Sequence, residues 1–399
     1  MINSLKAFAN KRILLLQGPV GPFFYYLSND LARVNSTVFK INFHGGDWLF
    51  YPRKAVNYRN SLDEWPSFLE SFLKKNRIDL ILLFGDCRSI HVVARDVAVK
   101  CGVQVGVFEE GYIRPYYITL EITGVNANSQ IPKNPEFYGA LTTTSSKIQS
   151  INPPFLFSMV WAMLYNVFGS LLRPFFPHYR HHRSLSIFDG ICWLKSFWRK
   201  QIYKIAERGF QKFLVTQQDK NFFLIPLQVG SDAQIHSHSK FNNVREFIVE
   251  VMDSFAQFAP PETLLVFKQH PLERGYSDHS EFIEAKSKYL NISERIMYIH
   301  DQHLPTLLSH ARGCVVINST VGLSAIFHGI NVKNMGKAIY DMPGLTFQGE
   351  LKDFWTSSEK PDPNLYEKFN AYVINSTQIN GNYYRRIPTK DFQSGVLWE

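Results

Sequence analysis

Two adjacent carboxylates in the stretch FEEGYIRP are of a type that does acid–base chemistry. Glu109 and Glu110 directly follow the apolar stretch VQVGV, which predicts a buried strand that ends on the acids. A carboxylate at a strand end can act as a general acid or base, and a neighbouring acid raises its pKa. Gly111 allows a sharp turn there. On its own the pattern favours a solvated corner, and because side chains alternate along a strand it leaves open which glutamate is catalytic.

Two further motifs carry groups that bind anions. VFKQHPLE places a lysine and a histidine at a predicted strand end, and its proline restricts the histidine to an extended conformation. In VVINSTVGLSAIFHG a buried strand leads into a helix, where hydroxyls and free N–H groups form an anion site, although a simple N-cap explains them equally. The phosphate-binding candidates are Lys268, His270, Pro271, Asn318, Ser319 and Thr320.

A third group of polar residues follows the strand predicted in IPLQVGSDAQIHSHS. Gln228, Asp232 and Gln234 lie at the strand end and in the loop after it. Asp232 could be a nucleophile, and an Asx turn is the structural alternative.

Two loops near the N-terminus complete the candidates. LLLQGPVGPFF, with Gln17 and Gly18, matches neither GxGxxG nor GxxxxGK[ST], and its prolines remove backbone donors. This argues against a dinucleotide or P-loop site. INFHGGDW predicts a flexible loop with His44 and Asp47, either part of an acceptor site or an ordinary glycine turn.

The sequence predicts no metal site. The histidine cluster lies among arginines, which repel a bound cation, and the cysteines lack metal-ligand spacing, as expected of reduced structural thiols. The residues concerned are His178, His181, His182, Arg173, Arg180, Arg183, Cys87, Cys101, Cys192 and Cys314.

Strands and helices must position these motifs, and the sequence predicts them from short apolar runs that alternate with helical patterns. Strands separated by helices of this length predict βαβ units, and therefore an α/β fold with two Rossmann-like halves whose ligands bind at the carboxyl ends of the strands. The predicted domains are an N-terminal Rossmann-like domain, a helical segment, a C-terminal Rossmann-like domain and a tail whose helices pack back on the first domain, with boundaries at 1–150, 151–215, 216–345 and 346–399.

The segment between the two halves differs from them in amino-acid composition. No charged residue occurs between Lys147 and Arg173, a length typical of a membrane span, but prolines and asparagines interrupt it. The alternatives for 151–173 are a helix in the bilayer interface or a helix buried in protein. The membrane-contact candidates are Trp161, Arg180, Arg183, Trp193, Trp198, Arg199 and Lys200.

Composition limits the class of protein. The chain has 399 residues, 45% of them hydrophobic and 19% charged, which is typical of a folded protein of two domains. A net charge of +9 suits nucleic acid, an anionic membrane or a phosphorylated substrate. No nucleic-acid module is recognisable. The N-terminus lacks signal-peptide features, which predicts a cytoplasmic protein.

Taken together, these motifs resemble the bacterial capsule polysaccharide biosynthesis/export proteins of the KpsS/LipB type. The resemblance is carried by LLLQGPVGPFF, KINFHGGDWLFY, FEEGYIRPYYITLE, GVNANSQIP, PLQVGSDAQIHSHS, KQHP and INSTVGLSAI. It implies a GT-B fold with two Rossmann-like domains facing across a cleft. It also implies a β-Kdo glycosyltransferase that moves Kdo from CMP-Kdo to a phosphatidylglycerol lipid and starts the oligo-Kdo linker of the capsule.

The motifs are also similar to those of bacterial sialyltransferases that use CMP-activated keto sugars. That likeness implies Glu109 or Glu110 as the acid/base, His270 as the group that stabilises the leaving cytidylate, and no metal or other cofactor. Retention of configuration implies either a nucleophile, with Asp232 as the candidate, or front-face attack. The acceptor or loop candidates are Gln17, Gly18, His44, Asp47, Arg114, Gln228 and Gln234.

Two other functions remain open. One is a GT-B transferase that uses another nucleotide sugar in capsule chain synthesis, and the other is a non-catalytic capsule export adaptor. The expected partners are a CMP-activated donor, an anionic lipid acceptor with its membrane surface, and other capsule synthesis or export proteins, but no nucleic acid. The expected location is the cytoplasmic face of the inner membrane.

Overall fold

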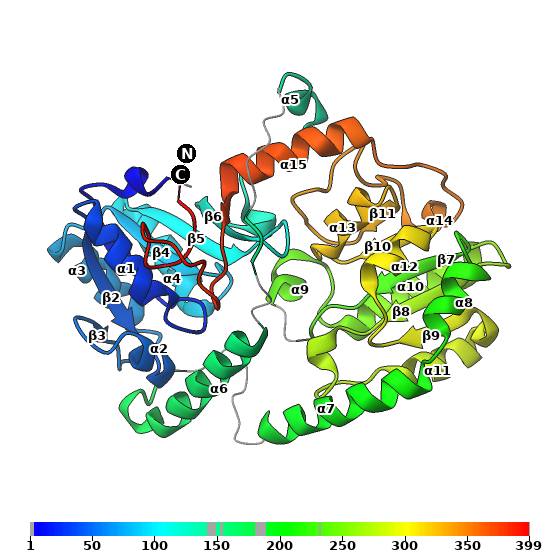
Figure 1. The fold of residues 1–399 in the computed structure, drawn as a ribbon, viewed down its shortest axis with the longest axis horizontal. Helices are drawn as coiled ribbons and strands as arrows, with labels where there is room; N and C mark the ends of the chain where they lie inside the picture. The colour runs from blue at the N-terminus through cyan, green and yellow to red at the C-terminus, as the bar shows by residue number, and fades with distance from the viewer. Residues whose placement is uncertain (1–3, 142–148, 152–154, 180–188, 231–232, 399) are drawn as a thin grey trace. The chain divides into compact units, whose positions relative to one another are not determined.

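A computed structural model describes residues 4–141, 149–151, 155–179, 189–230 and 233–398 (Figure 1). The chain forms two compact units. The first comprises Met1–Ile131, Thr144–Ile187 and Ala371–Glu399, and the second comprises Pro132–Thr143 and Phe188–Asn370. Both units are therefore built from segments that are discontinuous in the sequence.

The first unit is built on a mostly parallel sheet in the order β12-β6-β5-β4-β1-β2-β3. β1 to β5 pair in parallel, whereas β6 is antiparallel to β5 and β12 is antiparallel to β6. Its strands are β1 (Arg12–Leu15), β2 (Thr37–Asn42), β3 (Val56–Asn57), β4 (Leu80–Phe84), β5 (Gln104–Glu110), β6 (Tyr117–Ile122) and β12 (Gln378–Asn380).

Alternate residues of these strands bury two separate cores. Ile13 and Leu82 pack with Phe23 of α1 (Phe23–Arg33). Leu14 and Leu83 pack instead with α3 (Trp65–Lys75) and α4 (Ser89–Cys101). Strands that are apolar on both faces are typical of a sheet covered by helices on both sides.

The segment predicted as a flexible loop around His44 is a helix, so that prediction is wrong. α2 (Gly45–Phe50) begins after His44 and packs against α6 (Phe155–Leu171). A Cβ at Gly46 would lie 2.3 Å from the Tyr165 ring, and one at Gly169 would lie 1.9 Å from the His44 ring. The glycines therefore serve close helix packing rather than a turn.

The second unit contains a five-stranded parallel sheet in the order β11-β10-β7-β8-β9. Its strands are β7 (Phe222–Pro226), β8 (Leu264–Lys268), β9 (Ile296–Ile299), β10 (Gly313–Val316) and β11 (Asn331–Asn334). One mostly parallel sheet and one fully parallel sheet, both covered by helices, confirm the predicted α/β class with two Rossmann-like domains.

Helices of the second unit cover its sheet. One core joins Phe247 and Phe255 of α10 (Val244–Phe258) with Phe223 of β7 and with Trp355. The helices are α5 (Pro135–Gly139), α7 (Asp189–Ala206), α8 (Phe210–Thr216), α9 (Ala233–His238), α10 (Val244–Phe258), α11 (Ser280–Tyr289), α12 (Leu304–His310), α13 (Val321–Phe327) and α14 (Leu351–Phe354), and α15 (Pro363–Thr377) continues into the first unit. Gln234, predicted in a loop, lies in α9, which corrects that assignment.

Among the described residues, the segment 151–215 that separates the predicted Rossmann-like domains contains α6, α7 and nearly all of α8. α6 belongs to the first unit and α7 to the second. Among the described residues, no helix is both long and apolar enough to cross a bilayer.

Candidate active site

Glu109 lies at the carboxyl end of β5, as its sequence context predicts. Its backbone pairs with Thr119 of β6, and its Oε1 accepts a hydrogen bond from the N–H of Glu110 at 2.9 Å. Burial raises the pKa of Glu109 to about 7. The hydrogen bond from the Glu110 N–H and the charge of Arg88 act to lower this pKa, whereas the charges of Glu110 and Asp86 act to raise it. A carboxyl group with this pKa can both accept and release a proton near neutral pH.

Glu110 is bound to a different set of groups. Its Oε1 accepts a hydrogen bond from the Tyr384 hydroxyl at 2.9 Å, and the Tyr383 hydroxyl donates to the backbone carbonyl of Glu109 at 2.7 Å. Both tyrosines follow β12, the strand at the edge of the sheet. Both glutamates are half-buried, but their surroundings differ: the Glu110 carboxylate is bound by a tyrosine, and the Glu109 carboxyl group has a raised pKa.

The polar residues at the ends of β1 and β2 form a buried cluster in the first unit. Arg88 Nη1 donates to Gln17 Oε1 at 2.8 Å, and Gln17 Nε2 donates to Asp47 Oδ2 at 3.2 Å. The Tyr165 hydroxyl donates to Asp47 Oδ1 at 3.2 Å, and the Tyr179 hydroxyl to Gln17 Oε1 at 3.0 Å. The structure therefore brings together two predicted residues, Gln17 and Asp47, with three that the sequence patterns did not identify.

His44 joins this cluster as the N-cap of α2. Its Nδ1 accepts a hydrogen bond from the N–H of Gly46 at 3.2 Å, and its ring packs against Tyr165 and Tyr179. Burial lowers the pKa of His44, with Asp47 acting in the opposite direction. A neutral ring agrees with the acceptor role of Nδ1.

Of the two other predicted loop residues of the first unit, Gly18 touches this cluster and Arg114 does not. The Gly18 carbonyl accepts a hydrogen bond from Arg88 Nη1 at 3.4 Å. A Cβ at Gly18 would lie 2.8 Å from the Phe24 ring, so that glycine allows α1 to approach. Arg114 is exposed, and its Nε donates to the Gly111 carbonyl at 3.3 Å.

In the second unit, the ends of the neighbouring strands β7 and β10 share a hydrogen-bond network. Gln228 Nε2 donates to Asn318 Oδ1 at 3.0 Å, and the N–H of Asn318 donates to Gln228 Oε1 at 3.2 Å. Asn318 Nδ2 also donates to the Gln234 carbonyl at 3.0 Å. Ser319 Oγ accepts from the N–H of Val321 at 3.2 Å, whereas Thr320 is the N-cap residue of α13 without a side-chain capping bond.

The KQHP motif lies at the end of β8, as predicted. His270 caps a short 3₁₀ turn that begins at Pro271, with its Nδ1 accepting from the N–H of Leu272 at 3.2 Å. Lys268 is buried, and its Nζ donates to the His300 carbonyl at 2.8 Å. Burial lowers the pKa of Lys268. Lys268 therefore joins the ends of β8 and β9.

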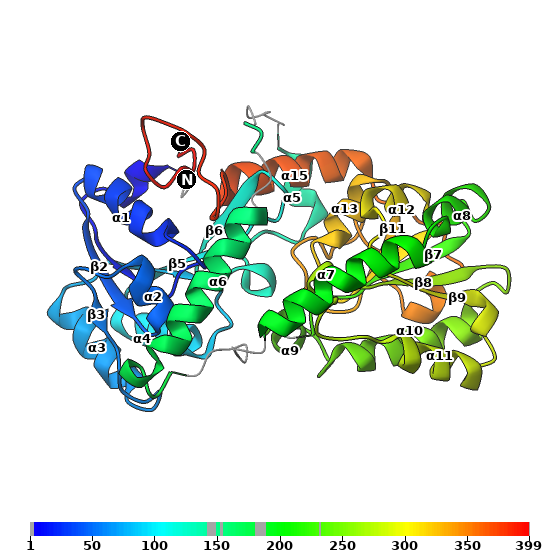
Figure 2. The same cartoon turned by 60° about the horizontal axis from the view of Figure 1, so that its bottom comes forward.

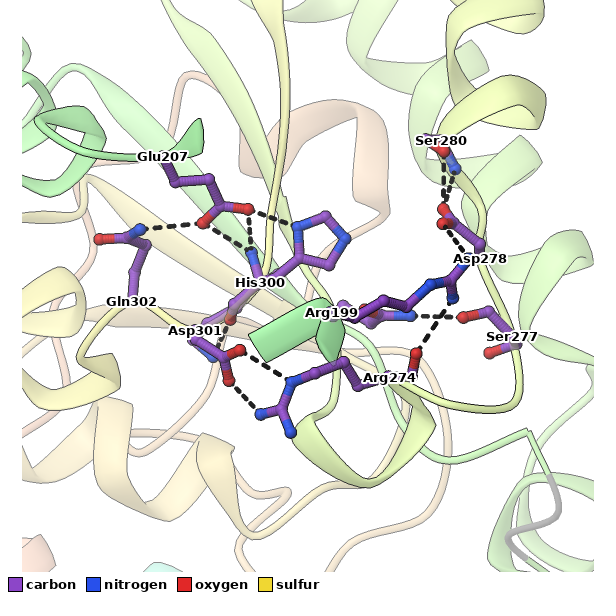
Figure 3. A network of polar contacts seen from close by, with 11 residues as sticks. Arg199, Glu207, Arg274, Ser277, Asp278, Ser280, His300, Asp301 and Gln302 are labelled. Atoms are coloured by element: carbon purple, nitrogen blue, oxygen red, sulfur yellow. Dashed lines mark hydrogen bonds and ion pairs between the residues drawn. The ribbon is translucent and has the colours of Figure 1, made fainter. Parts of the chain in front are cut away.

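Beside this motif lies a polar network that the sequence patterns did not reveal (Figure 3). Arg274 forms an ion pair with Asp301, with Nε donating to Oδ2 at 2.8 Å. Glu207 accepts from the backbone N–H and the ring Nδ1 of His300. Burial raises the pKa of Glu207, but hydrogen bonds from His300 and Gln302 outweigh it, so that the pKa is lowered. The sequence signal that could have indicated this network is the adjacent polar pair His300 and Asp301, which ends the predicted strand IMYIHD.

The predicted membrane-contact residues have different surroundings. Trp161 is half-buried and its Nε1 donates to the Tyr384 carbonyl at 3.2 Å, whereas Trp198 and Lys200 are exposed. Arg199 forms an ion pair with Asp278 at 3.2 Å. Predictions that lie outside the described residues concern Asp232, Arg180, Arg183 and the side chain of Trp193.

Two solved structures resemble this chain at low sequence identity. They are the β-Kdo 2,7 transferase and the β-Kdo 2,4 transferase of Thermosulfurimonas dismutans KpsC. The first has 16% identity and a TM-score of 0.45 and covers 93% of this chain and 92% of that chain. The second has 12% identity and a TM-score of 0.40 and covers 92% of each chain.

Curated sequences match much more closely. The capsule polysaccharide export protein KpsS of Escherichia coli is 41% identical over 379 residues, which is 94% of this chain and 97% of the relative. The capsule polysaccharide modification protein LipB of Neisseria meningitidis is 37% identical over 387 residues, covering 94% and 92%. The profile of the family described as capsule polysaccharide biosynthesis protein matches residues 79–384. These matches confirm the resemblance carried by the motifs, and the chain belongs to the capsule polysaccharide biosynthesis protein family.

Proposed function

We propose that this protein is a retaining β-Kdo glycosyltransferase. It moves Kdo from CMP-Kdo to a phosphatidylglycerol lipid at the cytoplasmic face of the inner membrane, and so starts the oligo-Kdo linker for capsule assembly and export. Family membership and the FEEG, KQHP and NST motifs support the substrates. The observation that carries the catalytic claim is Glu109, a half-buried carboxyl group at a strand end whose pKa is raised to about 7.

Glu109 is the proposed general base. The acceptor is an alcohol, and its oxygen must lose a proton as it bonds to C2 of Kdo. Glu110 is the weaker candidate because its carboxylate is already engaged by Tyr384. Its proposed role is to raise the pKa of Glu109 and to fix the end of β5.

The residues proposed to bind the sugar donor, CMP-Kdo, belong to the second unit. His270 is proposed to stabilise the negative charge on the leaving cytidylate, with the Ser319 and Thr320 hydroxyls binding the same phosphate. Lys268 is proposed to position this donor site through its hydrogen bond to the His300 carbonyl. Neither a metal ion nor another cofactor is part of the proposal.

Retention of configuration allows two routes. In the first, a carboxylate attacks C2 of Kdo as CMP leaves, and the acceptor oxygen then displaces that carboxylate. Asp232 is the proposed nucleophile. In the second, the acceptor oxygen attacks from the side on which CMP leaves. A Kdo adduct on Asp232, detected by mass spectrometry without acceptor, selects the first route.

Transfer with purified components tests the proposal. The protein is incubated with CMP-Kdo and a short-chain, water-soluble phosphatidylglycerol, and CMP release and product mass are followed. We expect the wild type to form a Kdo-lipid. Glu109→Gln should lower the rate by at least about 100-fold, because a general base typically accelerates a reaction by that factor or more. Exposed Glu359 supplies the control, Glu359→Gln, with unchanged rate. A folded wild type that makes no product contradicts the proposal.

The name of the Escherichia coli relative, capsule polysaccharide export protein, favours a second candidate, a non-catalytic export adaptor. An adaptor binds the lipid-linked polysaccharide without consuming CMP-Kdo. Binding of Kdo-lipid without CMP release from any nucleotide sugar tested would select it. Transfer from a different nucleotide sugar would instead select a chain-synthesis transferase.

A further inference from the structure

Helix α7 has two sides of opposite character, and the polar side faces the protein. Arg274 Nη1 donates to Ser196 Oγ at 3.2 Å, Arg199 pairs with Asp278, and the Tyr203 ring stacks on His300 with centroids 3.5 Å apart. These helix residues recur at intervals of three and four, so they share one side of α7.

The other side of α7 carries large apolar residues that no described part of the chain covers. In both views α7 runs along the outside of the second unit (Figures 1 and 2). The exposed fractions are 65% for Leu194, 59% for Phe197, 65% for Trp198, 56% for Ile202 and 76% for Ile205. Helices of globular proteins normally turn the apolar side inward, and an exposed apolar stripe marks an interaction surface.

Charge restricts what this surface can bind. Lys195, Lys200 and Lys204 are exposed along the same helix, and Arg208 follows it. The stretch 194–206 contains neither aspartate nor glutamate. Lysine stems can lie along an apolar phase while their ammonium groups stay at its charged boundary. The combination is that of a helix lying in an anionic bilayer interface.

We propose that the outer side of α7 is a docking surface for an anionic lipid bilayer. The five apolar side chains enter the interface, and the lysines contact lipid phosphates. Arg199 is not part of this surface because Asp278 and the Arg274 carbonyl hold its guanidinium on the inner side. The inference deepens the proposed function, on which its meaning rests, by naming the surface that brings the enzyme to a lipid acceptor.

The inner side of α7 connects this surface to the candidate donor site. Ser196 and Arg199 contact Arg274, which lies in the loop that begins with His270 and Pro271. Tyr203 contacts His300, whose carbonyl accepts from Lys268. Docking through the outer side therefore leaves every one of these contacts in place.

Vesicle sedimentation without CMP-Kdo tests the inference. Full-length protein is mixed with vesicles of phosphatidylglycerol and phosphatidylcholine, or of phosphatidylcholine alone. We expect binding mainly to the anionic vesicles. Lys195→Gln/Lys200→Gln/Lys204→Gln should weaken it by about 100-fold, at about fivefold per lysine. Trp198→Ser/Ile202→Ser/Ile205→Ser should abolish sedimentation at the same lipid concentration.

Matched variants on other surfaces separate docking from general changes. The charge control is Lys54→Gln/Lys75→Gln/Lys360→Gln, which removes three exposed lysines. The apolar controls are Val99→Ser and Tyr289→Ser, at positions 79% and 80% exposed. All should bind vesicles like wild type. If the controls and the α7 variants lose binding equally, or if neither set loses it, the inference is overturned.

Two further readouts distinguish other occupants and other failures. Sedimentation equilibrium measures whether the protein is a dimer. A dimer that the serine variant dissociates would assign this surface to a second copy of the chain and overturn the inference. The α7 variants should transfer Kdo to the water-soluble acceptor at the wild-type rate. Loss of that activity in a folded variant would also overturn it. Because vesicle binding needs no donor, a wild type that binds lipid but transfers nothing contradicts only the proposed function.

Discussion

The hydroxyl of Tyr384 lies 2.9 Å from Oε1 of Glu110 and donates a hydrogen bond to it. One residue belongs to β5 and the other to the segment after β12, so this bond joins the candidate catalytic strand to a part of the chain 274 positions away. Glu110 is thereby fixed, while its neighbour Glu109 has the raised pKa.

Tyr384→Phe should lower the free energy of unfolding by about 1–3 kcal/mol, because it removes a hydrogen bond to a charged group in a part-buried position. Urea denaturation measures the change. Tyr289→Phe, at an exposed position, is the control and should have little effect. An equal change in both variants would show that the Tyr384 bond does not contribute specifically.

The rate of transfer should rise with pH through about 7, because the proposed base, Glu109, must be deprotonated to accept a proton. The pH profile of kcat/KM measures this ascending limb, and Glu109→Gln should eliminate it. Glu121 is a matched control, since burial also raises its pKa to about 7 while Tyr112 and Ser129 bind its carboxylate. If Glu121→Gln, rather than Glu109→Gln, removes the limb, the assignment of the base is wrong.

Stability should depend on pH through the same carboxyl group. The pKa of Glu109 rises from 4.5 to about 7 on folding, so the folded state binds the proton more tightly. This stabilisation is complete below pH 4.5 and is lost as the pH rises to about 7. Relative to wild type, Glu109→Gln should therefore gain up to about 3 kcal/mol between pH 4.5 and 8. Denaturation curves at several pH values measure the gain, and a difference independent of pH would refute it.

Gly169→Ala should separate α6 from α2, because the new methyl group would lie 1.9 Å from the His44 ring. Overpacking of this kind typically lowers stability by about 1–3 kcal/mol. Faster amide hydrogen exchange in Phe155–Leu171 would report the loss of packing. Gly139→Ala is the matched control, because a Cβ there meets nothing within 4 Å and the residue is helical. Faster exchange in the control, or unchanged exchange in Gly169→Ala, would contradict the packing argument.

Local patterns predicted those features that depend on neighbouring residues. The strand that ends on Glu109 and Glu110 follows from the apolar run before it, and the βαβ rhythm predicts both sheets. The hydrogen bond between Gln228 and Asn318, 90 positions apart, follows only once β7 and β10 are neighbours.

Contacts between distant segments could not be predicted. Tyr165 reaches Asp47 across 118 positions, and Glu207 reaches His300 across 93. No periodicity or spacing encodes such pairs. The GG pair after His44 was misinterpreted for a related reason, because glycine that permits a turn also permits the close approach of another helix, and only the tertiary packing distinguishes the two.

The position of β12 has a consequence for the order in which the protein is made. Tyr383 and Tyr384 complete the surroundings of Glu109 and Glu110, yet the ribosome reaches them 274 residues later. The second unit, by contrast, is synthesised entirely before Ala371. During translation the second unit can therefore finish folding while the strand that carries the candidate base still lacks its neighbouring edge strand. The proposed transfer activity should therefore appear late in the synthesis of each nascent chain.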